Sequence, residues 1–67
     1  MITQESECAV IIPAFNEQGA VGRVVHSVKR VTTSPVWVID DHSTDGTAVE
    51  ASKAGARVIR LPEQLDA

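Results

Sequence analysis

The chain has 67 residues, 43% of them hydrophobic, and a formal net charge of −3 at pH 7. A chain of this length makes at most one small domain with a marginal core, and no apolar run approaches the ~20 residues that span a membrane. The scattered Lys and Arg residues form no basic stripe for nucleic acid, and a single cysteine excludes a disulfide or a cysteine metal cluster within one chain.

A polar leader, residues 1–7, has neither the positive start nor the apolar stretch of a signal peptide. We therefore predict a soluble, cytoplasmic chain without a transmembrane segment. The continuous apolar run Cys8–Ile12 then predicts a strand buried on both faces, which Pro13 ends.

A helix is expected after this first strand. Asn16 can cap its N-terminus, and apolar residues recur at helical spacing from Ala20 as far as Val31. The helix should end near residues 32–35, ahead of the next apolar run.

The second half of the chain repeats this order. Val36–Ile39 has the pattern of a second buried strand, and Ser43 or Thr44 can cap a second helix that Gly55 stops. Ala56–Leu61 alternates apolar and charged residues, which is typical of a third strand at an edge.

This alternation predicts an α/β fold, a three-stranded parallel βαβαβ unit that is half of a Rossmann-like sheet. Right-handed crossovers give the spatial order 3-2-1, with both helices on one face. The first two strands look apolar on both faces, so one face and the outer edge of the first strand would lie open. We therefore predict that the chain alone is poorly folded or self-associates through its exposed sheet.

Two loops leave the carboxyl ends of the first two strands, where open parallel sheets bind their ligands. They span residues 13–17 and 40–47 and contain several carboxylates but no Lys or Arg. A free phosphate would be repelled there, so a bound diphosphate would need a divalent metal such as Mg²⁺ or Mn²⁺. Phe15 can stack on a planar base, and Asp41 can accept a hydrogen bond from a base or ribose. These residues predict a metal–nucleotide site.

Several polar residues of the second loop also have simpler explanations. Asp40 and Asp41 could end a strand and cap a turn. Asp45 suits the first turn of the second helix better than a ligand position. His42 stands beside two aspartates, but it has no second histidine nearby, so we assign it no metal.

Two segments resemble the opening signatures of family-2 glycosyltransferases. Val10–Glu17 reads VIIPAFNE where the family usually has VIIPAYNE, and Val38–Thr47 reads VIDDHSTDGT where it usually has VVDDGSTDGT. Gly55–Ile59 is similar to the family's third strand, so the resemblance runs from Val10 to Glu63. Two long signatures at the proper separation are far more specific than a lone glycine motif.

The resemblance implies the N-terminal part of a GT-A fold, which binds a nucleotide-diphosphate sugar and passes the sugar to an acceptor. In that family the residues matching Pro13 and Phe15 flank the base, the one matching Glu17 lies near the ribose, and the one matching Asp41 contacts the base. The residue matching Asp40 is usually supportive. These are the candidate nucleotide-sugar-binding residues, and the longer motif favours a binding role for Asp41 over a purely structural one.

The ending Leu61–Glu63 is most similar to polyprenyl-phosphate glycosyltransferases of the dolichol-phosphate mannose synthase type. Two features depart from the family pattern: His42, where Gly, Asn or Ser is commoner, and residues 64–67. We expect a partial nucleotide-binding unit at residues 8–63 and a truncated tail at 64–67. The metal-binding Asp-x-Asp and the catalytic base would then lie downstream.

No residue of this chain is therefore assigned as catalytic or as a metal ligand, and the divalent metal is expected only in the full-length enzyme. The chain alone is expected to be inactive, with a nucleotide-diphosphate sugar as its partner. The alternative is a non-catalytic nucleotide- or metal-binding α/β module.

Overall fold

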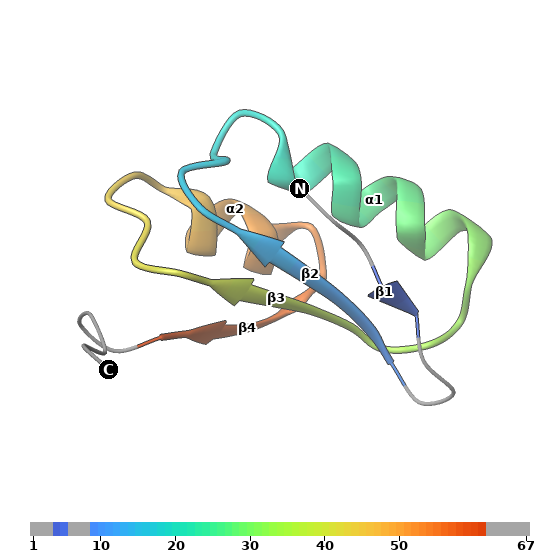
Figure 1. The fold of residues 1–67 in the computed structure, drawn as a ribbon. Helices are drawn as coiled ribbons and strands as arrows, with labels where there is room; N and C mark the ends of the chain where they lie inside the picture. Colours follow the sequence, from blue (N-terminus) through green and yellow to red (C-terminus); the bar gives the residue numbers. More distant parts are fainter. Residues whose placement is uncertain (1–3, 6–8, 62–67) are drawn as a thin grey trace.

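The fold is a small sheet with two helices, seen in a computed structural model that describes residues 4–5 and 9–61 (Figure 1). Its elements in chain order are β1 (Gln4–Glu5), β2 (Val10–Ala14), α1 (Val21–Val31), β3 (Val36–Asp40), α2 (Thr47–Lys53) and β4 (Arg57–Arg60). The expectations for Cys8 and for residues 62–67 lie outside the described residues. None of the described helices is long and apolar enough to cross a membrane.

The sheet has the strand order β1-β2-β3-β4. β2, β3 and β4 are parallel to their neighbours, so the predicted βαβαβ unit with the spatial order 3-2-1 is confirmed. β1 was not predicted. Two residues of the expected polar leader, Gln4 and Glu5, pair antiparallel with Ile11 and Val10 and cover that part of the β2 edge.

β2 continues through Pro13, where the sequence predicted its end. The Val10 N–H donates to the Pro35 carbonyl, and the Ala14 carbonyl accepts from the Asp41 N–H. Alternate residues of β2 therefore turn their peptide groups toward β3, and Pro13 falls between them. The N–H that proline lacks would point to the outer edge of β2, so no bond to β3 is lost.

Both helices cover the same face of the sheet, as predicted (Figure 1). Val21 and Val25 of α1 and Ala51 of α2 pack there on alternate residues of β2 and β3. The fully buried members of this core include Val10, Ile12, Val21, Val25 and Val38. Because the apolar positions of α1 recur every three to four residues, one stripe of the helix is buried and the other faces solvent.

α2 ends as its sequence predicts. Gly55 has a φ of 102°, and its N–H bonds to the Ser52 carbonyl while the Ala56 N–H bonds to the Ala51 carbonyl. These two bonds are the Schellman arrangement, which needs a residue in the left-handed region just past the helix. The chain is thereby turned back into β4.

The predicted helix caps are wrong. Asn16 does not cap α1: the helix begins after Ala20 without a side-chain cap, and its first turn is bonded instead to the Glu17 carbonyl. Ser43 and Thr44 do not cap α2 either. α2 begins after Gly46 without a side-chain cap, and the Thr47 N–H is accepted by Asp45 Oδ1 at 3.0 Å.

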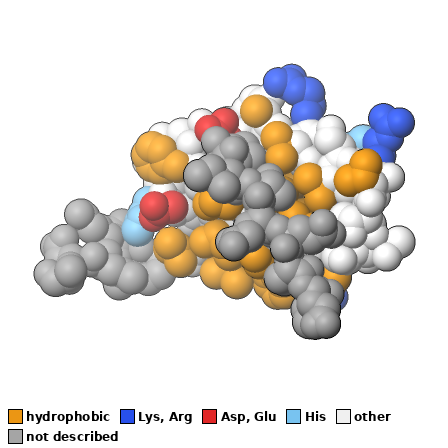
Figure 2. Space-filling model, turned by 45° about the vertical axis from the view of Figure 1, so that its right-hand side comes forward, with side chains coloured by type: hydrophobic (Ala, Val, Ile, Leu, Met, Phe, Trp, Pro, Cys, Tyr) orange, Lys and Arg blue, Asp and Glu red, His pale blue; other side chains and the backbone are white. Residues whose placement is uncertain are grey.

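The opposite face of the sheet is also apolar. Alternation of side chains along the strands places Ile11, Trp37, Ile39 and Ile59 there. Hydrophobic side chains gather on this side of the molecule (Figure 2), and Ile59 is 45% exposed. The Arg57 guanidinium lies 5.5 Å from the centre of the Trp37 ring, a cation–π contact that covers part of this face.

Candidate functional site

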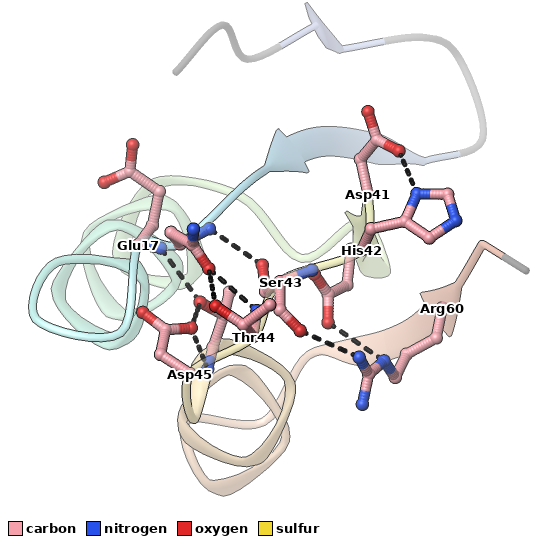
Figure 3. Close-up of polar contacts among 10 residues, drawn as sticks. Glu17, Asp41, His42, Ser43, Thr44, Asp45 and Arg60 are labelled. Carbon is pink, nitrogen blue, oxygen red and sulfur yellow. Dashed lines mark hydrogen bonds and ion pairs between the residues drawn. The ribbon is translucent and has the colours of Figure 1, made fainter. Parts of the chain in front are cut away.

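The two loops at the carboxyl edge of the sheet are bonded to each other (Figure 3). Asn16 is the central residue: its N–H donates to Ser43 Oγ at 2.8 Å, and its Oδ1 accepts the Thr44 N–H at 2.8 Å. Asn16 has a φ of 50°, a left-handed conformation that asparagine tolerates better than most residues. Its side chain thus bonds residues 28 positions away.

A second set of bonds joins the loops nearer the helices. The Glu17 N–H donates to Thr47 Oγ1 at 2.9 Å, and the Gly46 N–H donates to Gln18 Oε1 at 3.0 Å. Asp45 Oδ2 accepts the Gln18 N–H at 3.2 Å. The Thr47 hydroxyl donates in turn to Asp45 Oδ1, so one buried hydroxyl joins the two loops.

Asp45 carries a perturbed carboxyl group. The hydrogen bond from the Thr47 hydroxyl, supported by the N–H groups of Thr47 and Gln18, lowers the pKa of Asp45 below its ordinary value of 3.8. This carboxylate is held by bonds within the loop pair, two residues before α2 and not in the first turn of the helix as the sequence predicted.

A cavity of about 350 Å³ opens between the two loops. The residues that line it are Pro13, Ala14, Phe15, Glu17 and Asp41. The structure thus gathers all the candidate binding residues except Asp40 around one space. Phe15 is 58% exposed at its rim, and the cavity lies within the ~300–1,000 Å³ range of small-molecule sites.

Asp40 lies elsewhere. Its side chain is 1% exposed on the helix-covered side of β3, so it cannot touch a ligand in the cavity. Oδ1 accepts the Ser43 N–H at 3.1 Å, which closes a tight turn over the next two residues. Asp40 thus supports the turn that leads to Asp41, and its assignment among the binding residues stays a prediction.

Asp41 points away from this buried group, and its carboxylate is exposed. Asp41 Oδ1 lies 2.9 Å from His42 Nδ1, and His42 has a φ of 65°. The left-handed conformation explains why glycine or asparagine suits this position. It also places the imidazole beside the carboxylate that lines the cavity (Figure 3).

The sequence interpretation missed a cation at this edge. Neither loop contains Lys or Arg, but Arg60 at the end of β4 reaches the second loop and donates from Nη2 to the Ser43 carbonyl at 2.9 Å. The signal was present, because the parallel register pairs Asp40 with Arg60. That register could have been deduced by aligning the two strand patterns.

A wider groove of about 610 Å³ lies between α1 and α2 and includes Arg23, His26, Arg30 and Lys53. Helix residues make up most of its lining, and Gln18 and Gly19 complete it. None of the lining residues belongs to the two signature loops. We place the candidate site in the smaller cavity, because the predicted binding residues line that cavity.

The described residues do not by themselves form a metal centre. No group of three or more His, Cys, Asp or Glu side chains among them is arranged to hold an ion. Asp41 and Glu17 face the same cavity and could each supply an oxygen, but Mg²⁺ and Mn²⁺ take more ligands than that. Further ligands would have to come from the phosphates or from other residues.

Comparison with known proteins decides the family. The family model of glycosyl transferase family 2 matches residues 9–67. The chain belongs to glycosyl transferase family 2. The predicted resemblance is therefore confirmed at the level of the family.

Several curated proteins are similar to this chain. The chain is 46% identical over 55 residues to protein RfbJ of Shigella flexneri, covering 81% of this chain and 43% of that protein. It is 39% identical to glucosyl-3-phosphoglycerate synthase of Mycolicibacterium smegmatis, covering 82% of this chain and 20% of that one. It is 38% identical to 4,4'-diaponeurosporenoate glycosyltransferase of Staphylococcus aureus, covering 85% of this chain and 16% of that protein.

Solved structures agree with the GT-A fold. The crystal structure of M. tuberculosis glucosyl-3-phosphoglycerate synthase superposes with a TM-score of 0.72 at 32% identity, over 79% of this chain and 20% of that one. The crystal structure of a mycobacterial protein gives a TM-score of 0.75 at 33% identity, over 90% of this chain and 22% of that one. The chain spans less than half of the length of each of these relatives and structures.

Proposed function

We propose that this family 2 chain binds the nucleotide part of a nucleotide-diphosphate sugar in the cavity between its two signature loops. The observation that carries the proposal is the convergence of Pro13, Phe15, Glu17 and Asp41 on one cavity. The transfer of the sugar to an acceptor is proposed for the protein to which this nucleotide-binding unit contributes, because the unit supplies no assigned catalytic residue.

Each lining residue offers a different contact. Phe15 presents an exposed ring on which a base can stack, and Pro13 adds a rigid apolar wall beside it. Asp41 offers a carboxylate that can accept hydrogen bonds from a base or a ribose hydroxyl, and Glu17 offers a second one. The bonded loops hold these groups in place before the ligand arrives, which reduces the entropic cost of binding.

The charge at this edge favours a metal-loaded ligand. Asp41, Glu17 and Asp45 lie on the two loops, and Arg60 is already engaged with Ser43 and Asp40. A diphosphate without a cation would add negative charge to a negative site. We therefore propose that Mg²⁺ or Mn²⁺ accompanies the nucleotide, with the phosphates as its main ligands.

Calorimetric titration of the chain with UDP and GDP tests the proposal. Phe15→Ala should weaken binding by about 5- to 150-fold, since stacking on an aromatic side chain is worth roughly 1–3 kcal/mol per base. Asp41→Asn should weaken it by about tenfold or more, because a hydrogen bond to a charged group is worth roughly 1.5–3 kcal/mol. Replacing the divalent metal by chelator should weaken binding as well.

Matched substitutions outside the cavity provide the controls. Val49 is 60% exposed on α2, so Val49→Ala matches the loss of an exposed apolar side chain. Glu50→Gln removes a carboxylate that pairs with Lys53 at 3.6 Å. The proposal fails if these controls weaken binding as much as the cavity variants do. Equal affinity with metal and with chelator would remove the metal from the proposal.

Finer assignments rest on the sequence alone. The polyprenyl-phosphate subgroup was predicted from Leu61–Glu63, of which only Leu61 is described. That subgroup and a cytoplasmic location stay predictions. Turnover of a nucleotide-diphosphate sugar by the purified chain would contradict the expectation that the unit alone is inactive.

A further inference from the structure

Arg60 links the edge strand to the loop that carries Asp41. It is the last residue of β4, and its guanidinium lies across the end of β3 (Figure 3). Nη2 donates to the Ser43 carbonyl at 2.9 Å, and Nε lies 3.3 Å from Asp40 Oδ2. One side chain thus contacts both ends of the segment from Asp40 to Ser43.

Asp40 needs this contact. Its Oδ2 is buried and has no hydrogen bond among the described residues, so the ion pair with Arg60 is the contact that balances its charge. A buried carboxylate without a partner is strongly unfavourable. The burial of Asp40 and the position of Arg60 are therefore linked.

Ser43 is fixed from three directions. Its N–H donates to Asp40 Oδ1, its carbonyl accepts from Arg60, and its Oγ accepts the Asn16 N–H. Asp41 and His42 are the two residues between the fixed points, and His42 sits in a left-handed conformation. The direction of the Asp41 carboxylate thus depends on both ends of this short segment being held.

We propose that Arg60 is a positioning residue for nucleotide binding, which acts by holding the segment that presents Asp41 to the cavity. The proposal rests on the nucleotide-binding function proposed above. Arg60 is 58% exposed, so solvent screens its charge, and its proposed effect on binding lies in the geometry that it imposes on this segment. A planar guanidinium can engage the carboxylate and the carbonyl at once, which a lysine ammonium does less well.

The test compares substitutions on the same strand of the full chain. Arg60→Gln should raise the Kd for UDP or GDP with Mg²⁺ by about tenfold or more and speed the exchange of the Ser43 amide hydrogen. Arg60→Lys should restore part of the affinity. Arg57→Gln is the matched control, because Arg57 lies on the same strand over Trp37, on the opposite face of the sheet. It should leave both readouts within about twofold of the wild-type values.

A double variant separates positioning from simple loss of stability. Asp40→Asn combined with Arg60→Gln removes the buried charge together with its partner, so the thermal midpoint should recover toward that of the wild-type chain. The affinity should stay low, because the Ser43 carbonyl is still not held. Full recovery of affinity in this variant, or an equal loss in Arg57→Gln, would overturn the proposal.

The two proposals can fail separately. If the wild-type chain binds no nucleoside diphosphate, the nucleotide-binding function falls, and the positioning role is then decided by amide exchange alone. An unchanged exchange rate of Ser43 in Arg60→Gln would overturn that role. Binding by the wild-type chain with unchanged affinity in Arg60→Gln would overturn the role and leave the function standing.

Discussion

The polar residues of the two family signatures divide into two groups. Asn16, Ser43, Thr44 and Thr47 bond one loop to the other, and none of them lines the cavity. Phe15, Glu17 and Asp41 line it. The first group therefore supports the loops, and the second is available to a ligand.

Thr47 is the buried link between the two loops and sets the ionisation of Asp45. Thr47→Val removes the hydroxyl that donates to Asp45 and accepts the Glu17 N–H, so the pKa of Asp45 should rise toward its ordinary value of 3.8. The unsatisfied Glu17 N–H should also cost about 1–3 kcal/mol of stability. Carbon-detected NMR titration of the Asp45 carboxyl and urea unfolding measure the two effects.

The lowered pKa of Asp45 also determines whether its contribution to stability grows or falls with pH. Asp45 titrates below its unfolded value, so its stabilising contribution is present above about pH 4 and is lost as the pH falls through the folded pKa. Thr47→Val should flatten this acid dependence, whereas Thr47→Ser keeps the hydroxyl and should preserve it. An Asp45 pKa that is the same in all three chains would contradict the assigned cause.

The sequence predicted the residues that line the cavity better than the residues that hold the two loops in place. Pro13, Phe15, Glu17 and Asp41 follow two adjacent parallel strands, and that is sufficient to bring them to one edge. Asn16 was misassigned as a helix cap because its partner, Thr44, lies 28 residues away, and local rules consider only nearby backbone groups. Arg60 was missed for the same reason, since its contacts depend on strand register.

Element positions were predictable to within a few residues where periodicity is strong. The strands β2, β3 and β4 and both helices lie where apolar spacing placed them. β1 was not predictable, because a two-residue strand of Gln and Glu has no apolar pattern. The sequence pattern alone places a strand end at Pro13, because the side of the strand on which the missing N–H lies depends on strand register.

Gly55 determines how α2 joins β4. Gly55→Ala should destabilise the chain by about 1–2 kcal/mol, because its φ of 102° lies in the region that side chains disfavour. The added Cβ would also approach Lys29 Cε at 3.1 Å, but that flexible side chain can move. The loss of stability therefore comes mainly from the unfavourable backbone conformation. Urea unfolding of the variant measures the loss.

Gly19, between β2 and α1, gives the matched control. A Cβ at Gly19 would meet nothing within 4 Å, and its backbone is outside the left-handed region. Gly19→Ala should therefore be neutral or stabilising by up to about 1 kcal/mol. A similar loss in both variants would show that the conformation of Gly55 is not the cause.

At the scale of the whole molecule, charge and apolar surface are separated. Most of the described carboxylates lie at the carboxyl edge of the sheet, while Arg23, Arg30 and Lys53 lie along the groove between the helices. The remaining face of the sheet is apolar (Figure 2). Pro13 of the cavity pairs with Ile39 of this face, so the cavity adjoins the apolar surface.

We expect the chain to self-associate through the sheet face that carries Ile11, Trp37, Ile39 and Ile59. The outer edge was expected to contribute too, but β1 covers part of it, and the edge strand β4 carries exposed arginines that disfavour strand pairing. The apolar face is therefore the stronger driving force, at roughly 25 cal/mol for each Å² of apolar surface removed from water. Sedimentation equilibrium over a range of concentrations should show dimers or larger species.

Two exposed apolar residues allow a matched test of this surface. Ile59 is 45% exposed on the sheet, and Val31 is 83% exposed at the end of α1. Ile59→Thr keeps a β-branched side chain on the strand and should weaken association by about tenfold, since each buried methylene is worth roughly 0.8 kcal/mol and both copies lose it. Val31→Thr should have no effect, although more of its side chain is in water. A monodisperse monomer at all concentrations, or equal effects of the two substitutions, would show that the sheet face does not drive association.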